Sequence, residues 1–295
     1  MSSLLNTTIP IVDNEFKLLI ENPRWDADRK FIEELWQKYE PYADSNFQTE
    51  ITISFHNRFW EMYLACSLID QGIELLPRNK RKGPDICMKI QERIAWIEAV
   101  APKGGAGPDA LQKPILEVGK VHFSSVPEEK IILRYQSSIL EKFNKYQGYI
   151  EDETVKRNDA YVIAVNGKRI PYSNLEDDIP NIIKSVLPFR DLNVIIDWES
   201  NKIVGEEYSY RPEVKKESGA SVSTRVFLDP VFSGISGILF SNSDFLNHPP
   251  KIGKEFVFVH NPLASNPLPK GWLSVGREYE IKDNRLEVKN WNENM

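Results

Sequence analysis

Two carboxylates of this sequence stand where burial would make an ionised group costly. Asp85 follows Gly83 and Pro84 at the expected start of a strand, and Glu98 lies inside the apolar run 94–100. A carboxylate in such a run loses its hydration, so it needs a hydrogen-bond partner, a cation or a metal ion. Two carboxylates brought together form a hard-oxygen site of the kind that binds Mg²⁺. The pattern therefore indicates metal-dependent phosphodiester chemistry.

A third acidic residue, Glu61, belongs to the same candidate set. It is the one charged residue in the segment 59–66, which is apolar on nearly every side of a helix predicted over 57–75. A glutamate buried on such a helix is costly, and groups of that kind concentrate at functional sites.

A long helix predicted over 126–149 supplies basic and polar side chains. The pattern Ser125-Val126-Pro127-Glu128 fits a capping box at its start. Beside its apolar stripe, Arg134, Ser138 and Lys142 recur at intervals of four residues, so they share one side of the helix.

Further cations are candidates for contact with substrate phosphates. Four of the five residues at 78–82 are basic and directly precede Gly83, and Lys103 lies in a Gly/Pro-rich loop at 101–108. Basic side chains next to an acidic pair would hold a phosphodiester backbone. The predicted substrate contacts are Arg78, Lys80, Arg81, Lys82, Lys103, Arg134 and Ser138.

Each candidate also has a purely structural interpretation. Asp85 could be a turn residue after Pro84. Glu98 could pair with Arg93 or Lys103, and Glu61 with Arg58. The charged side of the long helix could simply face solvent.

The order of these pieces resembles the PD-(D/E)xK nuclease superfamily, whose members have the restriction-endonuclease-like fold. The resemblance covers about residues 57–167 and implies a mixed sheet, flanked by helices, that holds an acidic pair and a lysine around Mg²⁺ or Mn²⁺. Pro84-Asp85 matches the PD of the motif and Glu98 its second acid, so both would be metal ligands. Glu61 matches the acid that many members carry on the first core helix.

The chain departs from the motif at its lysine. That lysine belongs two residues after the second acid, where this sequence has Val100. Residues 98 and 100 of a strand share one face, so Val100 points where a cation is wanted. Some members take this lysine from the following helix, which makes Lys142 the natural substitute and Lys103 the second choice. The predicted catalytic set is Glu61, Asp85, Glu98 and Lys142.

The resemblance and the alternation of strands with helices predict an α/β or α+β fold with a mixed central sheet. Residues 1–50 are expected to form a helical extension, and residues 51–295 one compact restriction-endonuclease-like domain. In the second half, strands are predicted at 160–165, 194–198, 235–240 and 255–260, a helix at 178–189, and a long surface loop, with a hairpin as one possibility, at 206–223.

Composition bounds the class of protein. The chain has 295 residues and a formal net charge of −6, so no global basic field draws it to nucleic acid, although a local patch can still do so. Cys66 and Cys87 are expected to be reduced core thiols, and the spacing of cysteines and histidines disfavours structural zinc. No secretory or membrane-spanning segment is recognised, which predicts a cytoplasmic protein without membrane contact.

Two classes of function are consistent with these features. The first is a metal-dependent nuclease acting on DNA, with RNA possible, by attack of a Mg²⁺-activated water. The second is a catalytically inactive protein of the same fold that serves as a binding or scaffold module. A metal hydrolase acting on another substrate is a weaker third, and a homodimer is possible for any of them.

Overall fold

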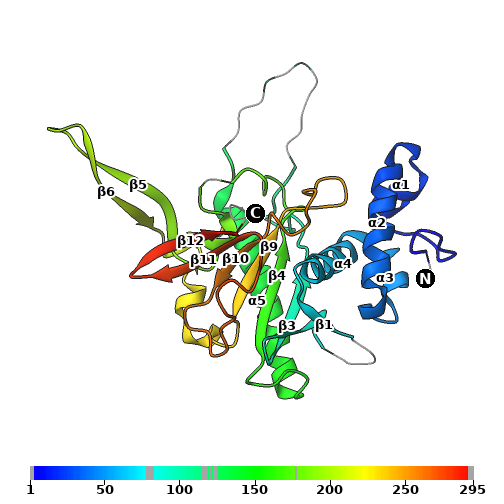
Figure 1. Ribbon diagram of the computed structural model, residues 1–295. Helices are drawn as coiled ribbons and strands as arrows, with labels where there is room; N and C mark the ends of the chain where they lie inside the picture. Colours follow the sequence, from blue (N-terminus) through cyan, green and yellow to red (C-terminus); the bar gives the residue numbers. More distant parts are fainter. Residues whose placement is uncertain are drawn as a thin grey trace.

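A mixed sheet of eight strands runs through the centre of the molecule, with helices packed on both faces (Figure 1). The computed structural model describes residues 3–77, 83–113, 119, 121, 125–176 and 178–291. The sheet confirms the expected α/β class and the mixed central sheet. Its strands, in spatial order, are β1 (Glu74–Leu76), β2 (Ile86–Ile90), β3 (Arg93–Val100), β4 (Ala160–Asn166), β9 (Gly237–Ser241), β10 (Val257–His260), β11 (Arg277–Lys282) and β12 (Arg285–Asn290).

Strand direction changes along the sheet. The strands β1, β2 and β3 form an antiparallel meander, whereas β4 runs parallel to both β3 and β9. The remaining pairs are antiparallel for β9 with β10, parallel for β10 with β11, and antiparallel for β11 with β12. The long helix between β3 and β4 is the crossover that a parallel pair requires.

The first helices pack together on one face of the sheet. They are α1 (Asn14–Glu21), α2 (Asp26–Tyr39), α3 (Phe47–Ile51) and α4 (Phe55–Asp70), with 3₁₀ turns at Pro23–Trp25 and Glu40–Tyr42. The helix α4 is buried along nearly its whole length, as its all-round apolar composition predicts. It lies between the sheet and α1–α3, so the predicted extension 1–50 shares one hydrophobic core with the sheet.

The end of α4 differs from the prediction. The helix stops at Asp70 rather than near Leu75, because Gly72 adopts a left-handed φ of 79° and turns the chain into β1.

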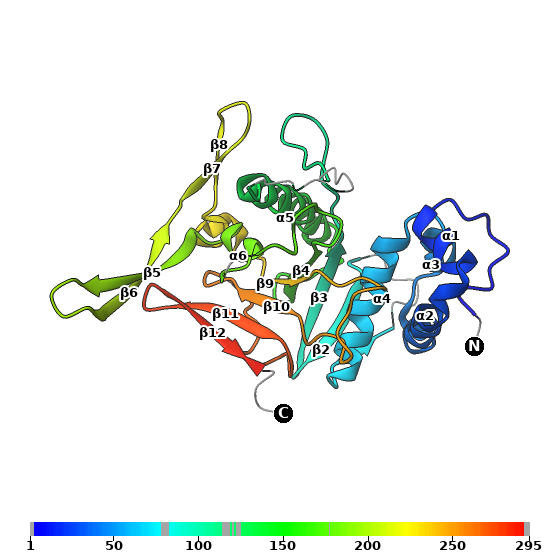
Figure 2. The same ribbon diagram turned by 90° about the horizontal axis from the view of Figure 1, so that it is seen from above.

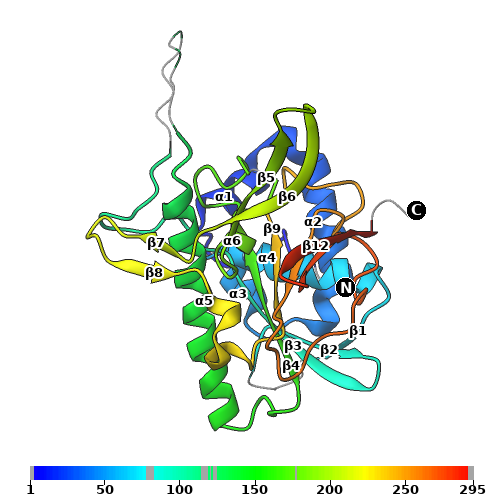
Figure 3. The same cartoon turned by 90° about the vertical axis from the view of Figure 1, so that its left-hand side faces the viewer.

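The opposite face of the sheet is covered by α5 (Glu128–Glu151), which Figure 3 shows along one side of the molecule. The predicted capping box is wrong. Pro127, not Ser125, occupies the N-cap position of α5. No side chain there accepts a hydrogen bond from the first turn of the helix. Tyr135, Ile139 and Phe143 of the predicted apolar stripe are buried against the sheet.

The region 178–223 differs most from its prediction. The predicted helix at 178–189 is only the single turn α6 (Asn181–Lys184), because Pro180 and Pro188 bracket it. The apolar run 194–198 belongs to β5 (Phe189–Asp197), which pairs with β6 (Lys202–Tyr210) in a separate ribbon rather than entering the central sheet. Figure 2 shows this ribbon extending away from the body. The predicted loop at 206–223 contains the end of β6 and the hairpin β7 (Glu213–Lys215) with β8 (Ser221–Ser223), followed by 3₁₀ turns at Val226–Leu228 and Pro230–Phe232.

Both cysteines are buried and free, as expected. Burial raises the pKa of the Cys66 thiol to about 12, so this group stays protonated at neutral pH. Within the described ranges, no helix has the length and apolar character needed to cross a bilayer.

Candidate active site

The alternation of β3 sends Glu98 towards α5. Trp96 and Val100 pack in the core beneath α5, whereas Ala95 and Ile97 pack in the core beneath α4. Because side chains alternate along a strand, Glu98 shares the α5 face. Its side chain is only 1% exposed, so the carboxylate is removed from water.

Two lysines and a tyrosine of α5 meet this carboxylate. The Nζ atoms of Lys142 and Lys145 lie 3.2 Å and 2.6 Å from Oε1 of Glu98. The hydroxyl of Tyr149 lies 3.5 Å from Oε2 and completes the contacts on the helix side. The three side chains recur at i, i+3 and i+7, the spacing of one helix face. The lysine expected from the helix thus lies beside the second acid.

Charge and burial act against each other at Glu98. Burial raises the pKa of its carboxyl and the neighbouring charge of Asp85 raises it further, while Lys142 and Lys145 oppose both. For Lys145, burial disfavours the ammonium, but contact with Glu98 outweighs it and raises the pKa of the lysine. The cluster therefore keeps a cation fixed against a poorly hydrated carboxylate.

Asp85 lies beside Glu98 at the end of the β2–β3 pairing. Ile86 pairs with Ile97, so residue 85 continues the ladder next to residue 98. Its Oδ2 atom accepts a hydrogen bond from the backbone N–H of Ala99 at 2.8 Å, which satisfies a donor of β3 just beyond the last paired residue of β2. The hairpin itself therefore brings the two predicted metal ligands to adjacent positions.

The two carboxylates offer oxygen atoms, the kind of ligand that Mg²⁺ takes in proteins. Among the described residues, no group of three or more histidine, cysteine, aspartate or glutamate side chains could hold a metal ion. In proteins, Mg²⁺ is commonly held by one or two carboxylates together with waters and substrate phosphates. At Glu98, Oε2 is the less engaged oxygen, because both lysines contact Oε1.

Glu61 lies in a different network, on the α4 side of the sheet. Tyr39 donates a hydrogen bond to Oε1 at 2.6 Å and Arg58 donates one to Oε2 at 2.5 Å, so both oxygens are engaged. Arg58 also contacts Asp44 and Glu50. The ion pair between Glu61 and Arg58, which is the structural interpretation of this glutamate, is therefore present in the structure.

Asp85 electrostatically links the two networks. Burial lowers the pKa of Arg58, but Glu61, Asp44 and Asp85 together outweigh it and raise that pKa. The charge of Asp85 therefore acts on Arg58, a cation on the α4 side, and on Glu98, a carboxylate on the α5 side.

The predicted substrate contacts on the helix are tied to other groups. Arg134 donates from Nε to the carbonyl of Lys103 at 2.8 Å, and this bond fixes the Gly-rich loop to α5. Ser138 is 3% exposed and donates to the carbonyl of Arg134, one turn earlier. Lys103 is exposed, and neither it nor Arg93 forms the predicted alternative pair with Glu98.

The basic cluster Arg78, Lys80, Arg81 and Lys82 lies outside the described residues.

Two residues of the site were absent from the sequence prediction. Lys145 and Tyr149 contact Glu98 but are not among the candidate residues predicted from the sequence. Extending the row that includes Lys142 by the helical steps i+3 and i+7 would have found them, since both lie on the face that meets β3.

Comparisons of the chain with models of protein families, with curated proteins and with solved structures found no match.

Proposed function

We propose that the protein is a Mg²⁺- or Mn²⁺-dependent nuclease acting on DNA. The observation that carries the proposal is the contact between Lys142 and Glu98, whose Nζ and Oε1 atoms lie 3.2 Å apart. Glu98 is also the neighbour of Asp85 across the β2–β3 hairpin. Two carboxylates with a lysine are the residue types that metal-assisted phosphodiester hydrolysis uses.

The order of the elements supports a restriction-endonuclease-like core. The helix α4 precedes the β2–β3 hairpin that contains both acids, and α5 then leads into β4, parallel to β3. This is the order on which the resemblance to PD-(D/E)xK nucleases rests, and the mixed sheet flanked by helices agrees with it.

The roles of the residues follow from their chemistry. A metal ion held by Asp85 and Glu98 would lower the pKa of a bound water and neutralise charge on the phosphate. Lys142 and Lys145 place positive charge beside Glu98, where it stabilises the negative charge that develops on the phosphoryl oxygens. Val100 cannot supply this charge, so the cations come from α5.

The experiment is a cleavage assay on supercoiled plasmid, linear duplex and single-stranded RNA, with Mg²⁺, with Mn²⁺ and with chelator. Asp85→Asn keeps the acceptor for Ala99, and Glu98→Gln keeps the volume of the buried side chain, so both are expected to fold. Each should lower metal-dependent cleavage by about 10²-fold or more. Glu92→Gln, an exposed acid in the turn of the same hairpin, is the matched control and should cleave like wild type. Equal cleavage by all four proteins would exclude the site.

A second candidate, an inactive binding module of the same fold, is favoured by one observation. Glu98 already contacts two ammonium groups and a hydroxyl, an arrangement that satisfies a buried carboxylate without a metal. This function predicts DNA binding in a mobility-shift assay without cleavage under any metal, and no tightening of binding by Mg²⁺.

A further inference from the structure

The β5–β6 ribbon is an arm with an unusual amount of exposed apolar surface. Its two strands pair only with each other, and Figures 1 and 2 both show it leaving the body. Its large apolar residues have exposed fractions from 39% to 89%, the highest at Trp198. They are Leu192, Val194, Ile195, Ile196, Trp198, Ile203, Val204 and Tyr210.

This surface is as large as one side of a stable protein interface. If a large apolar residue presents about 150–250 Å² when fully exposed, these fractions leave on the order of 800 Å² open to water, summed over both faces of the ribbon. One partner of a standard interface buries about 800 Å². Exposed apolar patches of more than a few hundred Å² mark interaction sites. In addition, an isolated two-stranded ribbon is only marginally stable in water, so a partner would also stabilise the arm.

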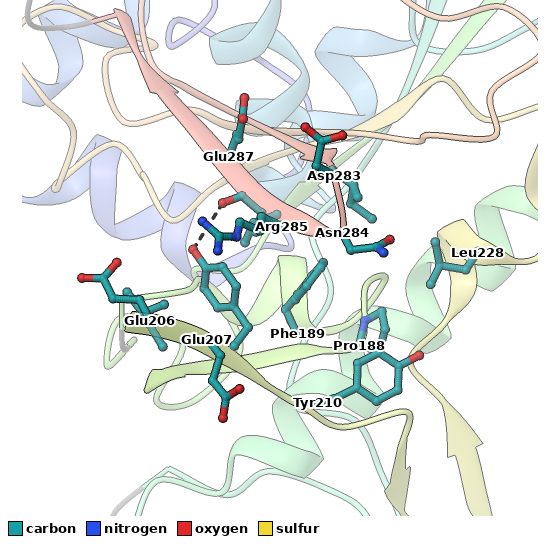
Figure 4. A pocket seen from close by; sticks show the side chains of 14 residues that line it. Pro188, Phe189, Glu206, Glu207, Tyr210, Leu228, Asp283, Asn284, Arg285 and Glu287 are labelled. Atoms are coloured by element: carbon teal, nitrogen blue, oxygen red, sulfur yellow. Dashed lines mark hydrogen bonds between the residues drawn. The ribbon is translucent and has the colours of Figure 1, made fainter. Parts of the chain in front are cut away.

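A hollow beside the base of the arm offers a complementary surface. Figure 4 shows it between β5–β6 and the β11–β12 hairpin. Its volume is about 740 Å³. Its apolar lining includes Phe189, Leu192, Leu228, Ile281 and Leu286. The hydroxyl of Tyr208 donates to the carbonyl of Leu286 at 3.2 Å and fixes the arm to β12, which is the edge strand of the central sheet.

The rim of this hollow carries opposite charges that lack ion-pair partners within the described part of the chain. Among the described residues that line the hollow, the one base is Arg285 on β12, and the acids without an ion-pair partner are Glu206 and Glu207 on β6 and Asp283 in the turn before β12; Glu287 pairs with Lys282. In an isologous interface, residue i of one copy meets residue j of the other and the reverse, so such a pair would form twice.

We propose that the arm and the hollow together form an isologous interface between two copies of this chain. Each arm covers the hollow of the other copy, and Arg285 of each copy meets Glu206 of the other. A nucleic acid is the wrong occupant, because residues 189–210 contain five acidic and two basic side chains. A second copy fits because one chain supplies both the apolar projection and the apolar hollow. The inference is independent of the proposed nuclease activity.

The test begins with sedimentation equilibrium of the full chain across a concentration range from about 0.1 to 100 μM, the span over which typical specific complexes dissociate. The expected mass at the upper end is twice the 34.1 kDa of one chain. Ile203→Asp, at an apolar position 66% exposed, should shift the protein to a monomer. Val12→Asp, at a position 68% exposed just before α1, is the matched control and should remain a dimer, because α1 lies on the opposite side of the body from the arm (Figure 1). A wild-type protein that is monomeric throughout would overturn the proposal, as would a dimer that Ile203→Asp leaves unchanged.

A charge exchange tests the contact itself without burying a charge in an apolar surface. Arg285→Glu and Glu206→Arg should each weaken the dimer, by about 30-fold in dissociation constant, because each variant removes two symmetry-related rim pairs worth about 1 kcal/mol apiece. The double variant should restore the dissociation constant to within about twofold of wild type. Weakening by both single variants without restoration in the double variant would contradict the assigned pair.

Discussion

The ammonium of Lys145 lies closer to Oε1 of Glu98, at 2.6 Å, than that of Lys142, at 3.2 Å. The two lysines share one oxygen of a carboxylate that is 1% exposed. Lys142 is also the more buried of the two, with a side chain 14% exposed against 48% for Lys145. The ammonium of Lys142 is thus enclosed at the site, whereas that of Lys145 contacts Glu98 and is also open to solvent, the side from which a phosphate would approach.

The two lysines should therefore contribute differently to cleavage. Lys142→Met removes a fixed charge and is expected to lower kcat by about 10²-fold with little change in KM. Lys145→Met should mainly raise KM, because its half-exposed ammonium meets the phosphate as it binds. Lys130→Met, a cation near the start of the same helix that pairs with Glu217, is the control. Identical effects of both site variants on kcat and KM would show that the lysines act as one unit.

The Arg58–Glu61 pair should act on stability rather than on catalysis. Arg58→Met leaves the carboxylate of Glu61 buried without its cation and should lower the free energy of unfolding by about 3–5 kcal/mol. Glu61→Gln keeps an acceptor for Tyr39 and leaves Arg58 with Asp44 and Glu50, so its cost should be smaller, about 1–3 kcal/mol. Urea denaturation followed by fluorescence measures both.

The cleavage rate of the folded Glu61→Gln protein separates the two roles of this residue. If Glu61 only anchors α4, the rate per folded molecule should stay within tenfold of wild type. A loss as large as that of Asp85→Asn would instead place Glu61 in the metal site.

The part of the site that sequence reasoning reached is the part that local pattern determines. A hairpin-length gap between Asp85 and Glu98 is enough to place the two acids side by side, because the turn sets the register. The buried character of α4 follows from its composition alone, and with it the need of Glu61 for a partner. Lys142 required the resemblance, since nothing in its helix distinguishes a residue facing β3 from one facing water.

The failures have a common physical cause. The run 194–198 has the composition of a core strand, and periodicity cannot tell an exposed ribbon from a buried strand. The strands β11 and β12 are rich in charged residues and pair at the edge of the sheet, so their sequences give little sign of burial. Likewise, which face of the sheet receives α4 and which receives α5 depends on long-range packing, and this separates Glu61 from Glu98.

Stability should fall in acid because of His56 on α4. Burial and, to a smaller extent, the charge of Arg169 lower the pKa of this imidazole to about 4, and its Nε2 lies 3.2 Å from Oδ1 of Asn166. The unfolded chain binds a proton below pH 6.5 and the folded chain only near pH 4, so this contribution is present above pH 6.5 and is lost as the pH falls through that window. Between pH 7 and pH 4, this imidazole should lower the free energy of unfolding of the wild type by about 3 kcal/mol. His56→Gln should lack this decrease, which is measured as the difference between the two proteins' free energies of unfolding at each pH. Arg169→Met should raise the pKa of His56 in the folded protein towards 6.5, because the repelling cation is gone, and so narrow the pH range over which stability is lost. Parallel pH profiles for wild type and His56→Gln would show that the imidazole titrates in the folded protein as it does in the unfolded chain.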